Sequence, residues 1–109
     1  MRSILQAEES KQCYLCIILN GDHSEKEWLH RHHVFFGRNR KKSEEYGLTV
    51  RLCVEHHEIG PEAVHRNREI DMMLKAIAQE AAEEHIGHER FMQEFGKNYL
   101  EEERWKKKS

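Results

Sequence analysis

The segment that decides the fold covers residues 29–57 and reads LHRHHVFFGRNRKKSEEYGLTVRLCVEHH. Apolar residues are frequent in its first part, and residues 48–53 alternate between apolar and polar side chains. Alternation is typical of a half-buried strand, so we predict a hairpin with strands at 28–36 and 48–53. Residues 37–47 are polar and basic and too many for a tight turn, so we predict a loop between the strands.

The spacing of cysteine and histidine predicts a structural metal site beside this hairpin. Cys13 and Cys16 are separated by two residues, and Cys53 and His56 repeat the same gap. Two such half-sites give three thiolates and one imidazole, a common ligand set for tetrahedral zinc. The alternative is that the cysteines are buried free thiols. A zinc ion would supplement the small core of a chain in which 38% of residues are hydrophobic.

The arrangement of the nine histidines predicts a second, reactive site. His32 and His33 are adjacent near the end of the first predicted strand, and His57 directly follows His56. Adjacent strand residues point to opposite faces, so His32 and His33 take different roles. One can ligate a divalent ion while the other accepts a proton from water, and phosphodiester hydrolysis needs both functions. Three more distant histidines are expected on the surface: His23, His85 and His88.

The rest of the chain predicts two C-terminal helices and a less regular N-terminal part. Apolar residues at helical spacing run from Ile70 to Ala81, and this helix is expected to end at Gly87. A second, short helix is predicted over residues 89–95. The N-terminal part is predicted in three pieces: a helical or frayed lead-in at 1–12, a tight turn at 13–16, and a short strand with a turn at 17–27.

Length and composition are those of one intracellular domain. The 109 residues leave no room for a second full core. The first residues have no apolar signal core, and no stretch approaches a membrane span. Three cysteines cannot pair off completely, so a reducing, cytoplasmic setting without a membrane is expected, with metal binding in place of disulfides.

Charge is informative only locally. The net charge is −2, so the whole chain carries no nucleic-acid signature. A basic run nevertheless lies in the predicted loop between the two histidine pairs. Such a run can contact DNA phosphates, which positions a protein without reading the sequence; the alternative is a solvated loop. The run consists of Arg38, Asn39, Arg40, Lys41 and Lys42.

These motifs together resemble the HNH endonucleases, the ββα-metal or His-Me finger class, with an embedded zinc knuckle. The motifs that carry the resemblance are Cys13-x₂-Cys16, the stretch 29–35, and Leu52-Cys53-x₂-His56-His57. More narrowly, residues 32–53, 64–67 and 95–99 are similar to a group of short phage and prophage HNH proteins, and distantly to Ref-like, recombination-associated nucleases.

The resemblance implies an α+β fold, a small ββα-metal domain over residues 1–100 with a structural zinc knuckle and C-terminal helices, followed by a charged tail at 101–109. It implies metal-dependent hydrolysis of DNA phosphodiester bonds in phage or prophage DNA processing or recombination. DNA is the expected partner, and a homodimer or a recombination protein is left open as a further one.

The resemblance also assigns roles to the histidines. His33 matches the general base, and His32 and His57 match ligands of a catalytic divalent ion, which is Mg²⁺, Mn²⁺, Ni²⁺ or Zn²⁺. The usual offset of the third ligand falls on Pro61, which cannot ligate. His65 is therefore the expected substitute, with Asn67 in reserve.

One further position departs from the family pattern, and the role of His30 has to be interpreted separately. The asparagine that braces the loop before the second strand would fall near Leu48, so this role is either vacant or moved to Asn39. His30 shares a strand face with His32 and is either an extra ligand or a half-exposed neighbour; we interpret it as the neighbour.

Two other functions remain open at this point. The chain could be a zinc-stapled nucleic-acid-binding module that does not cleave, or a metal-binding or protein-interaction domain without nucleic acid. His33 and a filled third ligand position favour the nuclease.

Overall fold

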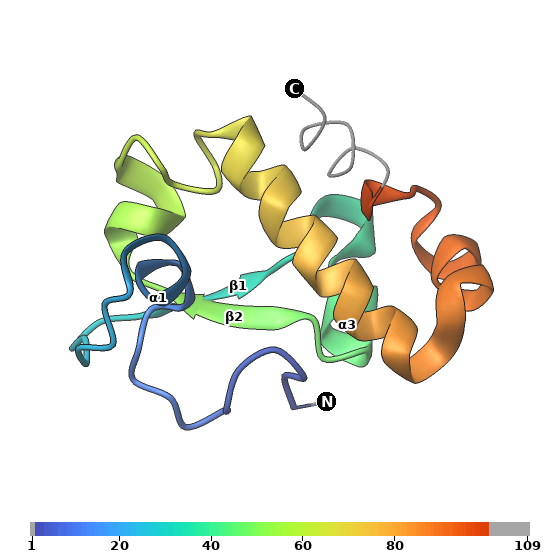
Figure 1. Cartoon of the computed structure of the whole chain (residues 1–109), viewed down its shortest axis with the longest axis horizontal. Coiled ribbons are helices and arrows are strands. Elements are labelled where there is room, and N and C mark those ends of the chain that lie inside the picture. Colours follow the sequence, from blue (N-terminus) through green and yellow to red (C-terminus); the bar gives the residue numbers. More distant parts are fainter. Residues whose placement is uncertain (1, 101–109) are drawn as a thin grey trace.

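A short antiparallel hairpin lies at the centre of the molecule (Figure 1). In this computed structural model, which describes residues 2–100, strand β1 spans His30–His33 and strand β2 spans Thr49–Leu52. His30 pairs with Leu52, and His33 pairs with Thr49. Both strands lie inside the predicted ones and are shorter. Together with the surrounding helices they make a small α+β fold.

The N-terminal segment covers the outer edge of β2. The Ser3 hydroxyl donates a hydrogen bond to the Thr49 carbonyl at 2.6 Å, and the Arg51 N–H donates to Gln6 Oε1 at 2.8 Å. These contacts satisfy backbone groups that an open sheet edge would leave unpaired. Residues 2–12 therefore follow the hairpin in bends and turns, and they form no helix.

Helix α1 spans Tyr14–Asn20 and corrects the turn and the strand predicted for this part of the chain. Cys13 caps its N-terminus, because the Cys13 sulfur accepts the Cys16 N–H at 3.4 Å. Gly21 ends the helix in the left-handed conformation, with φ 64°. The Asn20-Gly21 pair thus ends a helix with a left-handed glycine, where a strand turn had been predicted.

Two short helices replace the loop predicted between the strands. They are η1, which spans Gly37–Asn39, and α2, which spans Arg40–Glu45. The fully buried Ser43 of α2 ties this connection to the hairpin. Its hydroxyl donates to the Phe35 carbonyl at 2.7 Å and accepts the Phe35 N–H at 2.9 Å. Ser43 thus braces the connection before β2, the place where the role of a bracing asparagine was expected to be vacant or moved to Asn39.

The long helix α3 spans Arg68–Phe95 and crosses over the hairpin (Figure 1). Gly87 interrupts it with φ 83° and ψ 162°, a conformation that side chains other than glycine rarely adopt. The chain turns back after this break, so α3 consists of two helical parts, in agreement with the two predicted helices. Asn67 caps its start by accepting the Ile70 N–H at 3.2 Å.

The core lies between the hairpin, α1 and both parts of α3. The Phe35 ring contacts the rings of Phe91 and Phe95, with centroids 5.7 and 4.8 Å away. The fully buried Gln79 anchors the end of the described chain, because its Oε1 accepts the Tyr99 N–H at 2.7 Å. The largest buried apolar side chains are Leu15, Val34, Phe35, Leu48, Val50, Leu52, Leu74 and Phe91.

None of the helices within residues 2–100 is both long enough and apolar enough to cross a membrane. The charged tail predicted at 101–109 lies outside the described residues.

Candidate metal centres

The first centre joins α1 to the end of the hairpin. Cys13 and Cys16 belong to the start of α1, and Cys53 follows β2. His56 lies in η2, a π-helical turn that spans Glu55–Ile59. One ligand atom of each of these four residues lies within 4.8 Å of the others. All three cysteines are free thiols.

The distances in this centre fit a tetrahedral zinc ion. His56 Nδ1 lies 3.6, 3.4 and 3.5 Å from the sulfur atoms of Cys13, Cys16 and Cys53. Zinc bonds of about 2.3 Å to sulfur and about 2.0 Å to nitrogen give tetrahedral edges of about 3.5 Å for N–S and about 3.8 Å for S–S pairs. The Cys16 and Cys53 sulfur atoms are 3.9 Å apart, far beyond the roughly 2.05 Å of a disulfide. The four residues are positioned to bind a metal such as zinc.

The electrostatics of this centre also favour a cation. Burial, together with the neighbouring thiols of Cys13 and Cys53, raises the pKa of Cys16 to about 12. Thiolates packed this closely would repel one another, so a divalent cation is needed to let them ionise at neutral pH.

The second centre gathers the side chains of His32, His57 and His65. His32 comes from β1, His57 from η2, and His65 from the turn that leads to α3. The ring centroids are 4.8 to 5.2 Å apart, and one ring nitrogen of each lies within 4.8 Å of the others. The His65 N–H bonds to the His57 carbonyl at 3.4 Å, which holds the two residues side by side. The structure thus brings together the three residues expected at the catalytic ion.

His32 provides the test of whether this group suits a metal. Its side chain is only 2% exposed, and within residues 2–100 its Nε2 has no hydrogen-bond partner. A buried, unpaired polar atom is unfavourable, and an ion between the three rings would satisfy it. Burial and the neighbouring His57 and His65 lower the pKa of His32 to about 3. At neutral pH the ring is therefore uncharged and keeps a lone pair for an ion.

His33 points to the other side of β1 and contacts Glu44 of α2. His33 Nε2 and Glu44 Oε1 are 2.9 Å apart, and the second oxygen of Glu44 accepts a hydrogen bond from Arg31 at 2.8 Å. The hydrogen bond from His33, followed by the charge of Arg31, lowers the pKa of Glu44. An ionised Glu44 accepts the Nε2–H of His33, and this tautomer leaves the lone pair of His33 on Nδ1.

Glu44 was not predicted from the sequence as a partner of His33. It lies eleven positions after His33 and reaches it only because residues 40–45 form a helix. The Lys- and Glu-rich composition of that run favours a helix and was a usable signal. A helix of six residues, however, depends on tertiary contacts, and these were not predicted.

Two predicted alternatives have structural roles instead. Both polar groups of the Asn67 side chain bind backbone, since Oδ1 caps α3 and Nδ2 donates to the Pro61 carbonyl at 3.1 Å. Asn67 therefore shapes the turn beside His65. Asn39 Nδ2 lies 3.5 Å from the Phe95 carbonyl, so it contacts the end of α3.

His30 is partly buried and lies next to the second centre. Its Nδ1 is 2.8 Å from Nδ1 of His57. His30, His57 and Glu58 also offer ligand atoms within 4.8 Å of one another, so His57 is shared between two groups. The remote histidines are exposed, as expected: His23, His85 and His88.

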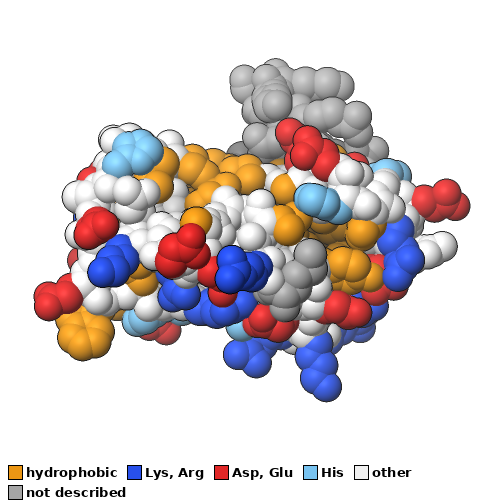
Figure 2. All heavy atoms as spheres, turned by 90° about the horizontal axis from the view of Figure 1, so that it is seen from below, with side chains coloured by type: hydrophobic (Ala, Val, Ile, Leu, Met, Phe, Trp, Pro, Cys, Tyr) orange, Lys and Arg blue, Asp and Glu red, His pale blue; other side chains and the backbone are white. Residues whose placement is uncertain are grey.

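The basic run divides into exposed and paired residues. Arg38, Arg40 and Lys41 are exposed, whereas Lys42 lies 3.1 Å from Glu94 of α3. Figure 2 shows Lys and Arg side chains interspersed with Asp and Glu over one face of the molecule. Any attraction for phosphate is therefore local to a few side chains and not a property of the whole face.

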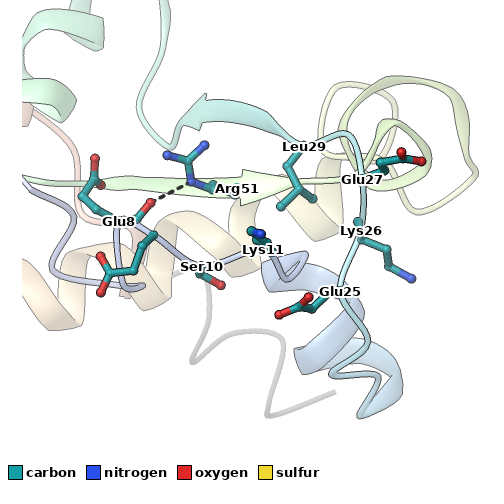
Figure 3. Close-up of a pocket in the computed structure, with 9 residues that line it drawn as sticks. Glu8, Ser10, Lys11, Glu25, Lys26, Glu27, Leu29 and Arg51 are labelled. Atoms are coloured by element: carbon teal, nitrogen blue, oxygen red, sulfur yellow. Dashed lines mark hydrogen bonds between the residues drawn. The ribbon is translucent and has the colours of Figure 1, made fainter.

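A groove between the N-terminal segment and the residues that precede β1 is separate from both centres, since none of their ligands lines it (Figure 3). Arg51 Nε donates to the Glu8 carbonyl across it at 3.1 Å. Glutamates outnumber basic residues in its lining, so it does not suit DNA phosphates. It is lined by Glu8, Glu9, Ser10, Lys11, Glu25, Lys26, Glu27, Leu29 and Arg51.

No protein-family model, curated protein or solved structure matches the chain. Its function therefore has to follow from the two centres and from the His33–Glu44 pair.

Proposed function

We propose that the chain is a metal-dependent endonuclease of the HNH class that hydrolyses phosphodiester bonds of DNA. The observation that carries this proposal is the division of roles between two consecutive residues of β1. His32 faces the three-imidazole centre, whereas His33 faces Glu44. Metal-assisted hydrolysis needs this combination of an ion and a base on one short segment.

The order of the elements supports a ββα-metal arrangement. β1 and β2 form the hairpin, η2 and the turn after it supply His57 and His65, and α3 follows and crosses the hairpin. In this arrangement the Cys₃His centre has a structural role, because it joins α1 to η2 one residue before His57. A zinc ion there would fix the backbone from which His57 projects.

The second centre would hold the catalytic ion through His32, His57 and His65. A divalent ion in that place supplies positive charge to the phosphate and to the leaving oxygen. Three neutral imidazoles suit Mn²⁺, Ni²⁺ or Zn²⁺ better than Mg²⁺, which prefers oxygen ligands.

His33 would act as the general base. Glu44 accepts the Nε2–H, so the lone pair on Nδ1 can take a proton from the attacking water. Glu44 also fixes the orientation of the ring, and Arg31 in turn holds Glu44.

The opposite directions of His32 and His33 suit an in-line reaction. Displacement at phosphorus places the attacking and the leaving oxygen on opposite sides. Consecutive Cα atoms are only about 3.8 Å apart. A phosphodiester at the end of β1 would therefore have His33 on the side of the attacking water and the three-imidazole centre on the side of the leaving oxygen.

The exposed basic residues of η1 and α2 would contact the DNA backbone. Arg40 and Glu44 are four residues apart in α2 and so lie on the same side of it. A phosphate contact from Arg40 would thus lie close to the His33–Glu44 pair, and Arg38 and Lys41 are exposed neighbours of Arg40 in the sequence. Such contacts give salt-sensitive binding with little sequence preference.

The direct test is nicking of a supercoiled plasmid by the protein loaded with one equivalent of zinc, enough for the Cys₃His centre alone, with and without added Mn²⁺, Ni²⁺ or Mg²⁺. We expect cleavage only with an added ion. His33→Ala should lower the rate by about 10²- to 10⁴-fold, the usual share of a general base. Its circular dichroism and melting temperature should equal those of the wild type. His85→Ala, which removes an exposed histidine of α3, serves as the matched control and should cleave normally.

Two results would contradict the proposal. Unchanged cleavage by His33→Ala would remove His33 as the base. DNA binding without cleavage in any of the three ions would instead identify a zinc-stapled binding module.

A further inference from the structure

The contact between His30 and His57 has a chemical requirement of its own. The two Nδ1 atoms are 2.8 Å apart, and the two ring planes are inclined by 75° in a T-shaped arrangement. Two nitrogen lone pairs repel at this distance, so one of the two atoms must carry a hydrogen. The contact is therefore a hydrogen bond, and its direction fixes the tautomer of both rings.

The role of His57 determines that direction. A neutral imidazole has one N–H and one lone pair. Because Nδ1 of His57 is engaged with His30, Nε2 is the atom left for an ion. If Nδ1 of His57 accepted the hydrogen bond, Nε2 would carry the hydrogen and could not ligate. Ligation thus requires that His57 Nδ1 donates and His30 Nδ1 accepts.

His30 itself does not belong to the three-imidazole group. His32, His57 and His65 share one group of ligand atoms, whereas His30 shares a different one with His57 and Glu58. His57 is thus the residue through which His30 contacts the three-imidazole group. Glu58 offers a carboxylate oxygen within 4.8 Å of this pair.

We infer that His30 is a positioning residue that accepts the Nδ1–H of His57 and so keeps the Nε2 lone pair directed to a divalent ion. This inference rests on the proposed metal-binding role of His57. An acceptor behind a ligating histidine fixes its tautomer and orientation and raises its basicity, and loss of such an acceptor typically weakens metal affinity by about 10- to 100-fold.

Two measurements on the zinc-loaded protein test this inference, and neither depends on DNA cleavage. Calorimetric titration with Ni²⁺ gives the affinity of the second centre. Nitrogen-15 NMR of the histidine rings, recorded without Ni²⁺, shows whether His57 carries its hydrogen on Nδ1 or on Nε2.

We expect the Nδ1–H tautomer for His57 in the wild type and its loss in His30→Leu. Ni²⁺ affinity should fall by about 10- to 100-fold in His30→Leu. His30→Asn places an amide oxygen near the former Nδ1 and should restore most of the affinity. His85→Leu is the matched control and should bind Ni²⁺ like the wild type.

The inference is overturned if His57 of the wild type carries its hydrogen on Nε2, or if His30→Leu binds Ni²⁺ as tightly as the wild type. Equal losses of Ni²⁺ affinity in His30→Leu and His30→Asn would also overturn it. His30 would then act by filling space and not by accepting a hydrogen bond. A different result would contradict the proposed nuclease function alone. In that case the protein binds Ni²⁺ and shows the expected tautomer of His57, but it does not nick plasmid DNA.

Discussion

His32 and His33 show how far single residues can be interpreted from the sequence. Their opposite directions follow from strand alternation alone, and the structure places the buried His32 in a group of three imidazoles and His33 beside a carboxylate. The partner of His33 could not be predicted in the same way. Glu44 is distant in the sequence, and its position depends on a helix whose formation requires the folded hairpin.

Glu44 should matter through the orientation of His33. Glu44→Leu removes the acceptor, so His33 can rotate and change tautomer, and we expect a loss of roughly 100-fold in the nicking rate, within the range of general-base effects. Glu44→Gln keeps an oxygen that accepts the Nε2–H and should lose less. Steady-state nicking rates of the two variants check this order. Equal activity of Glu44→Leu and wild type would remove the positioning role.

The burial of His32 predicts how stability depends on pH. The folded pKa is about 3, below the roughly 6.5 of an unfolded histidine. Between these values the unfolded chain binds a proton that the folded chain does not, so the free energy of unfolding falls as the pH falls below about 6.5. His32→Asn lacks this imidazole, so its free energy of unfolding should fall less steeply as the pH falls.

Urea unfolding of both proteins at a series of pH values between about 7.5 and 5, each with one equivalent of zinc, measures the difference. Loss of zinc in acid affects both proteins and cancels in the comparison. Parallel curves for the two proteins would show that the protonation of His32 does not oppose folding.

At the scale of the elements, hydrophobic periodicity predicted the hairpin and both parts of α3, and it failed for the short helices. α1 and α2 have seven and six residues, too few to be stable alone. What holds them in place is non-local: Cys13 and Cys16 at the start of α1 contact His56, and Ser43 of α2 bonds to the backbone of Phe35. The local sequence of these helices does not predict such contacts.

The exposed basic residues of η1 and α2 lead us to predict how DNA binding depends on salt concentration. Each lost phosphate contact lowers the slope of log affinity against log salt by about 0.9. The triple variant Arg38→Gln, Arg40→Gln, Lys41→Gln should therefore lower the slope by about 2.7. Fluorescence anisotropy with duplex DNA at several salt concentrations measures it. The double variant Lys11→Gln, Lys26→Gln, in the separate groove, is the control and should keep the full slope.

Helix α3 buries an ion pair close to the second centre. Lys75 Nζ is 2.9 Å from Asp71 and 4.3 Å from the Phe36 ring centroid, and both charged residues are 8% exposed. Lys75→Met leaves a buried carboxylate without its partner, and we expect a loss of about 3 kcal/mol in the free energy of unfolding. The double variant Asp71→Asn, Lys75→Met should recover much of it. Urea unfolding measures both; a loss below about 0.5 kcal/mol in the single variant would contradict the expected role.

At the scale of the whole molecule, the Cys₃His centre joins the start of α1 to the end of the hairpin and to η2. A structural zinc contributes about 10–16 kcal/mol of apparent binding energy in small peptides, as much as the total stability of many domains. Cys53→Ser, or chelation of zinc, should therefore unfold the chain, with loss of helical circular dichroism. Native mass spectrometry checks the zinc content. A zinc-free protein that melts like the loaded one would exclude a structural role.

The neighbouring positions of His56 and His57 have a consequence for how this chain can change. One peptide unit separates a ligand of the buried centre from a ligand of the imidazole group, so neither position can be adjusted while the other stays in place. An insertion of a single amino acid between His56 and His57 would preserve every ligand residue in the sequence. It would still move either His56 or His57 away from the other ligands of its centre. Evolution or engineering can therefore exchange side chains around η2 far more easily than it can alter the length of this turn.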